Sequence, residues 1–375
     1  MNGTAPKVFL ARYSSALRGT GLAGILSILF ALSAPMFAAR AAGPPPEKAA
    51  LILAAQATET RLASLRKDGF AAVALMLTDT NATREAAAAR VVREAKLPLD
   101  YWIEVARNPA MADAHPEWMA SIQTHEEWRR FFPEFPKPGS NDMVKVYPWV
   151  PMLYRETFDA HLQRLTVLLR NKPAPRRIFL NDLQGAPSAC GCGHHLCRWT
   201  TDYGPLKSAT RLPNDAAAKF VAAVKQLAPG AEVIPVWITE CEAHDRDGLC
   251  AGVSCFSGTC WREWTAQLMP LAAEARTLAA LVPYRAFRRD LPVYEQPAGW
   301  VSRSLAFFRD MPARYKTNGV PASRLIAVVQ GWDVSQVQIE AQLTRAVEVG
   351  AAGIVVAYGE IEQAWEPHLF KRGKD

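Results

Sequence analysis

Short apolar segments rich in Val, Ile and Leu recur along the chain and alternate with longer segments whose apolar positions follow a helical spacing. Near-continuous apolar runs are typical of strands buried on both faces, and their alternation with helices favours a parallel sheet. We predict eight strands, at residues 71–78, 99–106, 144–150, 177–183, 233–239, 279–285, 325–331 and 353–359. Helices are predicted between them, at residues 84–95, 154–169, 215–227, 261–277, 301–309 and 334–349.

Eight strand–helix repeats predict a (β/α)8 TIM barrel, a single domain with long loops after its second, fourth and fifth strands. The third predicted strand is the weakest because Pro148 interrupts it. The alternative is a doubly wound open sheet with a ligand crevice. No glycine-rich dinucleotide motif follows an early strand, so the pattern excludes a dinucleotide-binding domain.

The first 41 residues have the features of a secretory signal peptide. Three basic residues precede a short apolar run at 22–37, and the run is followed by small residues that end in Ala39-Arg40-Ala41. We therefore expect a signal peptide at 1–41, a Pro-rich spacer at 42–46 and the barrel domain at 47–375, in a periplasmic or secreted protein. The alternative is an uncleaved N-terminal anchor, which is the only membrane attachment that we expect.

The charge balance depends strongly on this leader. The whole chain has 43 Lys+Arg against 36 Asp+Glu, a formal charge of +7, and half of its residues are apolar. Residues 1–41 contribute four basic residues and no acid, which leaves 39 basic against 36 acidic groups. Such a balance is typical of a folded chain and gives no reason to expect a nucleic-acid partner.

The seven cysteines are the most distinctive feature of the composition. They fall after the fourth and fifth predicted strands, at Cys190, Cys192, Cys197, Cys241, Cys250, Cys255 and Cys260. In an exported protein disulfide bonds are the first expectation, although an odd count leaves at least one thiol over. Two alternatives stay open, a structural zinc ion at Cys190, Cys192, Cys197 and His194, and a redox or catalytic thiol. No other cofactor is expected.

Carboxylates stand at five of the eight predicted strand ends, where a parallel barrel carries its reacting groups. Asp182 and Glu240 end neighbouring strands, and a strand spacing of about 4.8 Å allows the roughly 5 to 5.5 Å separation of a retaining glycosidase pair. We therefore predict Asp182 as nucleophile and Glu240 as acid/base. The alternative is that each carboxylate caps a helix or pairs with an arginine.

Aromatic and charged side chains beside these ends suit a polyhydroxylated ligand, because rings stack on sugar faces and carboxylates accept from hydroxyls. The predicted substrate-binding residues are Trp102, Glu104, Trp149, Trp237, Arg285, Trp332, Asp333, Tyr358 and Glu360. The expected ligand is a carbohydrate.

Three segments around the fourth predicted strand carry a family resemblance: Phe179-Leu-Asn181-Asp182, the loop Cys190-Gly-Cys192-Gly-His-His-Leu-Cys197-Arg198-Trp199, and Asp202-Tyr203-Gly204. With the upstream segments His115-Pro116-Glu117-Trp118 and Tyr147-Pro-Trp149-Val-Pro151, the chain resembles secreted glycoside-hydrolase-like TIM barrels over roughly residues 70 to 360.

The resemblance implies a nucleophile at Asp182, where groups related to α-amylases and α-galactosidases have theirs, and an acid of the amylase type at Glu240. The chain departs from the β-galactosidase type, since Asn181-Asp182 stands for the Asn-Glu pair and Gln330 for the seventh-strand Glu.

The leading hypothesis is therefore an exported protein that hydrolyses O-glycosidic bonds in oligo- or polysaccharides with a carboxylate pair. Two alternatives remain, a non-catalytic carbohydrate-binding envelope protein and a metal-binding protein that uses its Cys and His residues.

Overall fold

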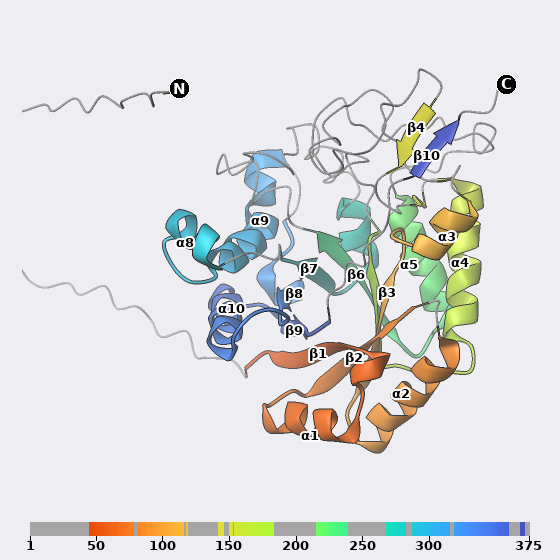
Figure 1. Cartoon of the computed structure of the whole chain (residues 1–375). Helices are drawn as coiled ribbons and strands as arrows, with labels where there is room; N and C mark the ends of the chain where they lie inside the picture. The colour runs from red at the N-terminus through yellow and green to blue at the C-terminus, as the bar shows by residue number, and fades with distance from the viewer. Residues whose placement is uncertain are drawn as a thin grey trace, which may run out of the picture. The chain divides into compact units, whose positions relative to one another are not determined.

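A computed structural model gives the fold (Figure 1). It describes residues 45–78, 81–115, 118, 142–145, 150–152, 154–183, 215–238, 268–282, 287–315, 319–359 and 368–371. Eight strands form the main sheet: β1 Glu47–Leu53, β2 Ala72–Leu77, β3 Leu99–Glu104, β5 Arg177–Asn181, β6 Glu232–Ile238, β7 Leu278–Leu281, β8 Leu325–Gln330 and β9 Gly353–Ala357.

The eight strands form a closed, all-parallel barrel. Each strand pairs with the next in the order β1-β2-β3-β5-β6-β7-β8-β9, and β1 pairs with β9 to close the ring. Helices follow most of the strands and lie around the outside of the ring, as Figure 1 shows. The predicted (β/α)8 fold is confirmed.

Two strand assignments need correction. The first barrel strand is β1, which the sequence pattern missed because Ala and Leu dominate its apolar part and both residues favour helix over strand. The predicted third strand, 144–150, is not part of the barrel. The described residues there form β4, Asp142–Lys145, which pairs antiparallel with β10, His368–Lys371. Inside the barrel β3 pairs directly with β5, so β5 remains the fourth barrel strand.

The helices follow the predicted spacing where the prediction can be compared. The described ones are α1 Glu59–Lys67, α2 Ala82–Glu94, α3 Pro109–Ala114, α4 Arg155–Leu169, α5 Ala216–Leu227, α8 Phe287–Tyr294, α9 Gly299–Tyr315 and α10 Gln336–Val349, with short 3-10 turns at Ala54–Gln56 and Ala322–Arg324. Their starts use ordinary capping chemistry: Asn81, Asn108 and Ser335 each accept a hydrogen bond from a backbone N–H in the first turn.

Alternation along the strands separates two apolar layers. In β3, Trp102 belongs to the cluster that fills the barrel, whereas its neighbours Tyr101 and Ile103 belong to the cluster between the barrel and the helices. Trp102 and Phe179 stack inside the barrel with ring centroids 5.7 Å apart. The barrel interior is therefore packed, and a ligand has access to it at an end of the ring.

Charged side chains link the amino-terminal ends of the strands. Arg176 contacts Glu47 at 2.6 Å and the fully buried Asp100 at 2.8 Å, while Arg177 contacts Glu47 at 2.8 Å and Glu232 at 3.2 Å. This network ties together β1, β3, β5 and β6 at the end that serves stability in parallel barrels.

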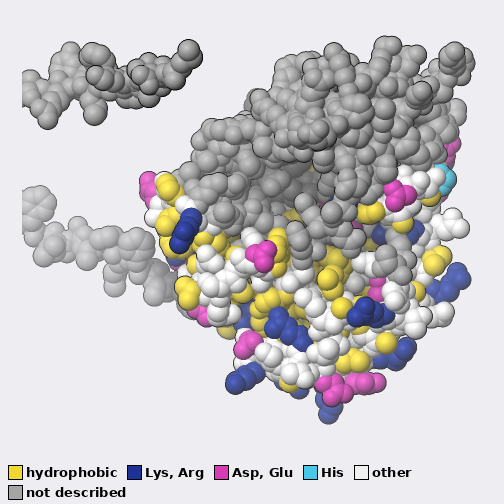
Figure 2. Space-filling model, in the orientation of Figure 1, with side chains coloured by type: hydrophobic (Ala, Val, Ile, Leu, Met, Phe, Trp, Pro, Cys, Tyr) yellow, Lys and Arg dark blue, Asp and Glu magenta, His cyan; other side chains and the backbone are white. Residues whose placement is uncertain are grey.

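Basic, acidic and apolar side chains are interspersed over the coloured surface in Figure 2. In the part of the chain that the structure describes, no helix combines the length and the hydropathy needed to cross a membrane.

Candidate functional site

The carboxyl ends of β3 and β5 bring three polar side chains together. Glu104 is the last residue of β3 and lies opposite Asn181, the last residue of β5, in the parallel register. Asp182 follows directly, and both Asn181 and Asp182 are almost fully buried, with 2% and 3% exposure. Neighbouring strand ends thus place two carboxyl groups and a carboxamide at one point of the barrel rim.

Glu104 is the centre of this cluster. Its Oε1 accepts a hydrogen bond from the indole nitrogen of Trp102 at 2.6 Å, and its Oε2 accepts one from the amide nitrogen of Asn181 at 2.9 Å. Burial raises the pKa of the Glu104 carboxyl above its ordinary value. That effect outweighs the hydrogen bonds from Asp182, Trp102 and Asn181 and the charge of Arg107, all of which act to lower the pKa.

The Glu104 and Asp182 carboxyl groups lie beside each other at the ends of β3 and β5. The hydrogen bond from Asp182 acts to lower the pKa of Glu104, but burial outweighs it. Because neighbouring carboxyl groups in a desolvated setting resist ionising together, this pair is suited to holding and transferring a proton.

The backbone at Asp182 supports a special role for this residue. Its φ of 59° lies in the left-handed region, which non-glycine residues enter at an energetic cost, although Asp tolerates it better than most. Such conformations concentrate at functional sites when the surrounding structure holds them in place. Here the backbone oxygens of Asn181 and Asp182 accept from the N–H groups of Val105 and Ala106, at 3.0 and 3.4 Å.

Side chains from the outer helices fix three strand ends. Arg164 on α4 donates to the backbone oxygen of Glu104 at 2.7 Å and to that of Val105 at 3.3 Å. Gln342 on α10 makes two hydrogen bonds to the backbone of Gln330, and Glu85 on α2 accepts from the Thr78 hydroxyl at 3.0 Å. The end of β3 that carries Glu104 is therefore held from outside the barrel, as precise sites require.

The structure brings together three of the predicted site residues, Trp102, Glu104 and Asp182. Trp102 has no solvent exposure, so it cannot contact a ligand directly. Its indole instead donates a hydrogen bond to Glu104. Trp332 is partly buried against the barrel interior, and the exposed Asp333 follows it with a left-handed φ of 50°.

Two predicted substrate-binding residues point elsewhere. Trp237 is 1% exposed and packs in the layer between the barrel and the helices, because it occupies an outward position of β6. Tyr358 packs in the same layer, against Phe70 with ring centroids 5.8 Å apart, and the guanidinium of Arg61 lies over its ring. In both positions strand alternation directs the ring away from the barrel axis.

The other predicted site residues lie outside the described residues. These are Glu240, Trp149, Arg285 and Glu360, together with the possible zinc ligands Cys190, Cys192, Cys197 and His194. Within the described ranges no group of three or more His, Cys, Asp or Glu side chains is arranged to hold a metal ion.

Two side chains of the site, those of Asn181 and Arg164, are not among the site residues predicted from the sequence. Asn181 precedes a predicted catalytic residue at a strand end, so its position alone was a usable signal. Arg164 lies on a predicted helix, and nothing in the local pattern distinguishes it from other basic residues on helices.

No protein-family model matches the sequence, and no curated protein matches it. Among solved structures, a bee venom hyaluronidase in complex with a hyaluronic acid tetramer is 15% identical, with a TM-score of 0.34, and the match covers 54% of this chain and 68% of that one. A D-allulose 3-epimerase from Methylomonas sp. is 9% identical, with a TM-score of 0.36 and coverage of 84% and 85%. An L-ribulose 3-epimerase is 10% identical, with a TM-score of 0.39 and coverage of 84% and 81%. Likeness at this level carries no argument about function.

Proposed function

We propose that the protein hydrolyses O-glycosidic bonds in oligo- or polysaccharides, with the Glu104–Asp182 pair as its proton-donating group. The observation that carries the proposal is the placement of Glu104 at the end of β3, opposite Asn181, with the buried Asp182 directly after Asn181. Glycoside hydrolysis needs a carboxyl group that stays protonated near neutral pH and protonates the leaving oxygen. A carboxyl group whose pKa is raised by burial, as that of Glu104 is, suits this role.

The contact between Glu104 and Asp182 favours a different role for Asp182 than the sequence suggested. We assign the acid/base role to the two carboxyl groups as a pair, because the raised pKa of Glu104 keeps a proton available there. Two adjacent carboxyl groups leave no space for a scissile bond between them, so the reaction needs a further carboxylate. Glu240, which follows β6 next to β5, remains our candidate for that group, as nucleophile or base.

The proposed setting is an exported protein. The leader at 1–41 and the cysteine-rich segments support a periplasmic or secreted location with disulfide bonds, and a carbohydrate substrate is the natural partner there.

The test is to replace Asp182 with Asn and Glu104 with Gln and to assay a panel of aryl glycosides and oligosaccharides. We expect each substitution to lower kcat/KM by about 100-fold or more, because general acid catalysis typically contributes that much. Glu104→Gln should also change the pH profile, since it removes one of the two coupled carboxyl groups. Glu340→Gln, at an exposed position of α10, is the matched control and should leave activity unchanged.

Thermal unfolding of each variant shows whether lost activity reflects lost structure. Unchanged turnover in a folded Asp182→Asn protein would contradict the assignment. Saturable binding of an oligosaccharide by the unmodified protein, without any product, would favour the non-catalytic carbohydrate-binding alternative instead.

A further inference from the structure

Helix α4 presents two side chains to the chain that leaves β3. His161 and Arg164 lie three residues apart, which places them on one face of the helix. The fully buried His161 donates through its Nε2 to the backbone oxygen of Val150 at 2.8 Å. Arg164 donates through its two terminal nitrogens, to the backbone oxygen of Glu104 at 2.7 Å and to that of Val105 at 3.3 Å.

These contacts begin where the sheet ends. The pairing of β3 with β2 stops at Ile103, and its pairing with β5 stops at Glu104. Beyond that point, Arg164 binds the backbone oxygens of residues 104 and 105, and the N–H of Val150 donates to the oxygen of Ala106 at 2.8 Å. Backbone groups that are shielded from water need such partners. Helix α4 therefore fixes the path of the chain that carries Glu104.

The position of the Glu104 carboxyl group depends on this path. Its oxygens reach the indole of Trp102 at 2.6 Å and the amide of Asn181 at 2.9 Å, so a small displacement of the backbone would lengthen both hydrogen bonds. A general acid must lie within hydrogen-bond reach of the atom that it protonates, and a misplacement of about 1 Å can cost about 100-fold in rate.

We propose that Arg164 is a positioning residue for the reaction, acting through the backbone of Glu104. This inference rests on the proposed function, because it names the support of the acid in that reaction. The geometry of the guanidinium is the property that matters. Arg164→Lys keeps the positive charge but replaces a rigid fork by a single ammonium group, which cannot hold two backbone oxygens in the same way.

The kinetic test compares Arg164→Ala and Arg164→Lys on the glycosides that the unmodified protein hydrolyses. We expect kcat to fall about 100-fold in the first variant and about tenfold in the second, with KM changed by less than about twofold. Arg155→Ala, at an exposed position of the same helix, is the matched control and should leave kcat unchanged. An unchanged kcat in a folded Arg164→Ala protein would overturn the proposal.

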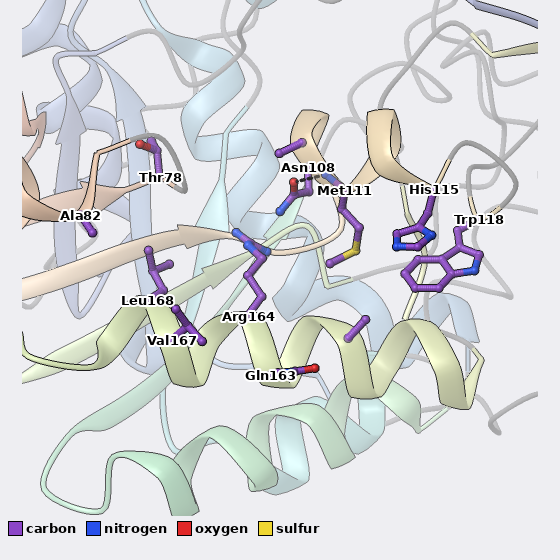
Figure 3. Close-up of a pocket in the computed structure, with 12 residues that line it drawn as sticks. Thr78, Ala82, Asn108, Met111, His115, Trp118, Gln163, Arg164, Val167 and Leu168 are labelled. Atoms are coloured by element: carbon purple, nitrogen blue, oxygen red, sulfur yellow. Dashed lines mark hydrogen bonds between the residues drawn. The ribbon is translucent and has the colours of Figure 1, made fainter.

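The surroundings of Arg164 allow a test by chemical rescue. Arg164 lines a cavity of about 600 Å³ along α4, so truncation to Ala leaves a space that a small cation can enter from this cavity. Figure 3 shows its side chain reaching from α4 toward the chain after β3, with Asn108 and Met111 beside it. Methylguanidinium should raise the kcat of Arg164→Ala severalfold, and methylammonium should do so less. Equal recovery with both cations would show that charge alone matters and would overturn the positioning role.

A titration of Glu104 tests the same role without any substrate. NMR of the protein labelled with 13C-glutamate follows the carboxyl group, and Glu104→Gln identifies its signal. Burial raises the pKa of Glu104, so a loosened strand end that admits water should lower it toward its ordinary value in Arg164→Ala. Loss of a positive charge alone would raise the pKa instead. Asp182 and Arg107, which also act on this carboxyl group, are left in place by the substitution.

The control for this titration is a side chain of the same kind at another strand. Gln342 on α10 makes two hydrogen bonds to the backbone of Gln330 at the end of β8, so Gln342→Leu should destabilise the rim without changing the pKa of Glu104. An unchanged or raised pKa in folded Arg164→Ala protein, or an equal fall in Gln342→Leu, would overturn the proposal. Failure of the protein to hydrolyse any glycoside would contradict the proposed function, and the titration would still decide whether Arg164 positions Glu104.

Discussion

At the residue scale, what matters is which groups hold protons and charges. Asp182 and Glu104 are carboxyl groups at strand ends, and the sequence pattern singles out both. Their roles depend on neighbours that come from different strands, the indole of Trp102 and the amide of Asn181. No local pattern shows that both oxygens of Glu104 accept hydrogen bonds, or that burial raises the pKa of this carboxyl group.

At the opposite end of the barrel, the ionic contacts of Glu47 make the stability of the fold depend on pH. Burial acts to raise the pKa of Glu47, but hydrogen bonds and charges from Arg176 and Arg177 outweigh it, so the pKa is lowered. A lowered folded-state pKa stabilises the protein above the unfolded pKa of about 4.3, and this stabilisation is lost as the pH falls through the folded-state value.

We expect Glu47→Gln to lower the free energy of unfolding at pH 7 by about 1 kcal/mol, since the carboxylate is partly exposed to solvent. The difference from the unmodified protein should shrink as the pH falls below about 4. Urea unfolding at a series of pH values measures both effects. Glu94→Gln, at an exposed position of α2, is the control. A difference that persists unchanged at low pH would show that the ionic contacts of Glu47 do not stabilise the fold.

At the scale of elements, the helices are determined largely by local chemistry and the strand ends are not. Apolar spacing predicts the starts of α2 and α10 to within two residues, and in the structure Asn81 and Ser335 cap these helices. In contrast, the end of β3 is held by Arg164, 60 residues later in the sequence, and the end of β8 by Gln342 on the following helix. Helix boundaries were therefore predictable, and the rigidity of the barrel rim was not.

The left-handed backbone at the end of α10 requires glycine. Gly350 caps the helix with a φ of 84°, and a Cβ added there would meet no atom within 4 Å. Gly350→Ala should therefore lower the free energy of unfolding by about 1 kcal/mol through backbone strain alone.

Gly230 is the matched control, because it also has open space around it but no positive φ. Gly230→Ala should be neutral or slightly stabilising, since it restricts the unfolded chain. Thermal and urea unfolding of the two variants compare them directly. Equal stability of both proteins would mean that the left-handed conformation at Gly350 carries no measurable cost.

At the scale of the whole molecule, closure of the barrel depends on β1. This strand pairs with β2 on one side and with β9, some three hundred residues later, on the other. Without β1, both neighbours would become open edges and the apolar barrel interior would be exposed.

A chain that begins at residue 45 should therefore unfold cooperatively, whereas one that begins at residue 54 should aggregate or melt without a cooperative transition. Size-exclusion chromatography and circular dichroism melts distinguish these outcomes. A cooperative melt of the shorter chain at an unchanged temperature would show that the ring tolerates an opening at this point.

The sequence by itself determined the alternation of strands and helices and the carboxylates at the strand ends. Strands buried on both faces must be apolar along their length, and a parallel barrel carries polar groups where its strands emerge. Only the tertiary structure decided that β1 closes the ring in place of 144–150, that Trp237 and Tyr358 face outward, and that Glu104 lies between Trp102 and Asn181. These features depend on contacts between residues far apart in the chain. Local propensity and residue spacing carry no information about such contacts.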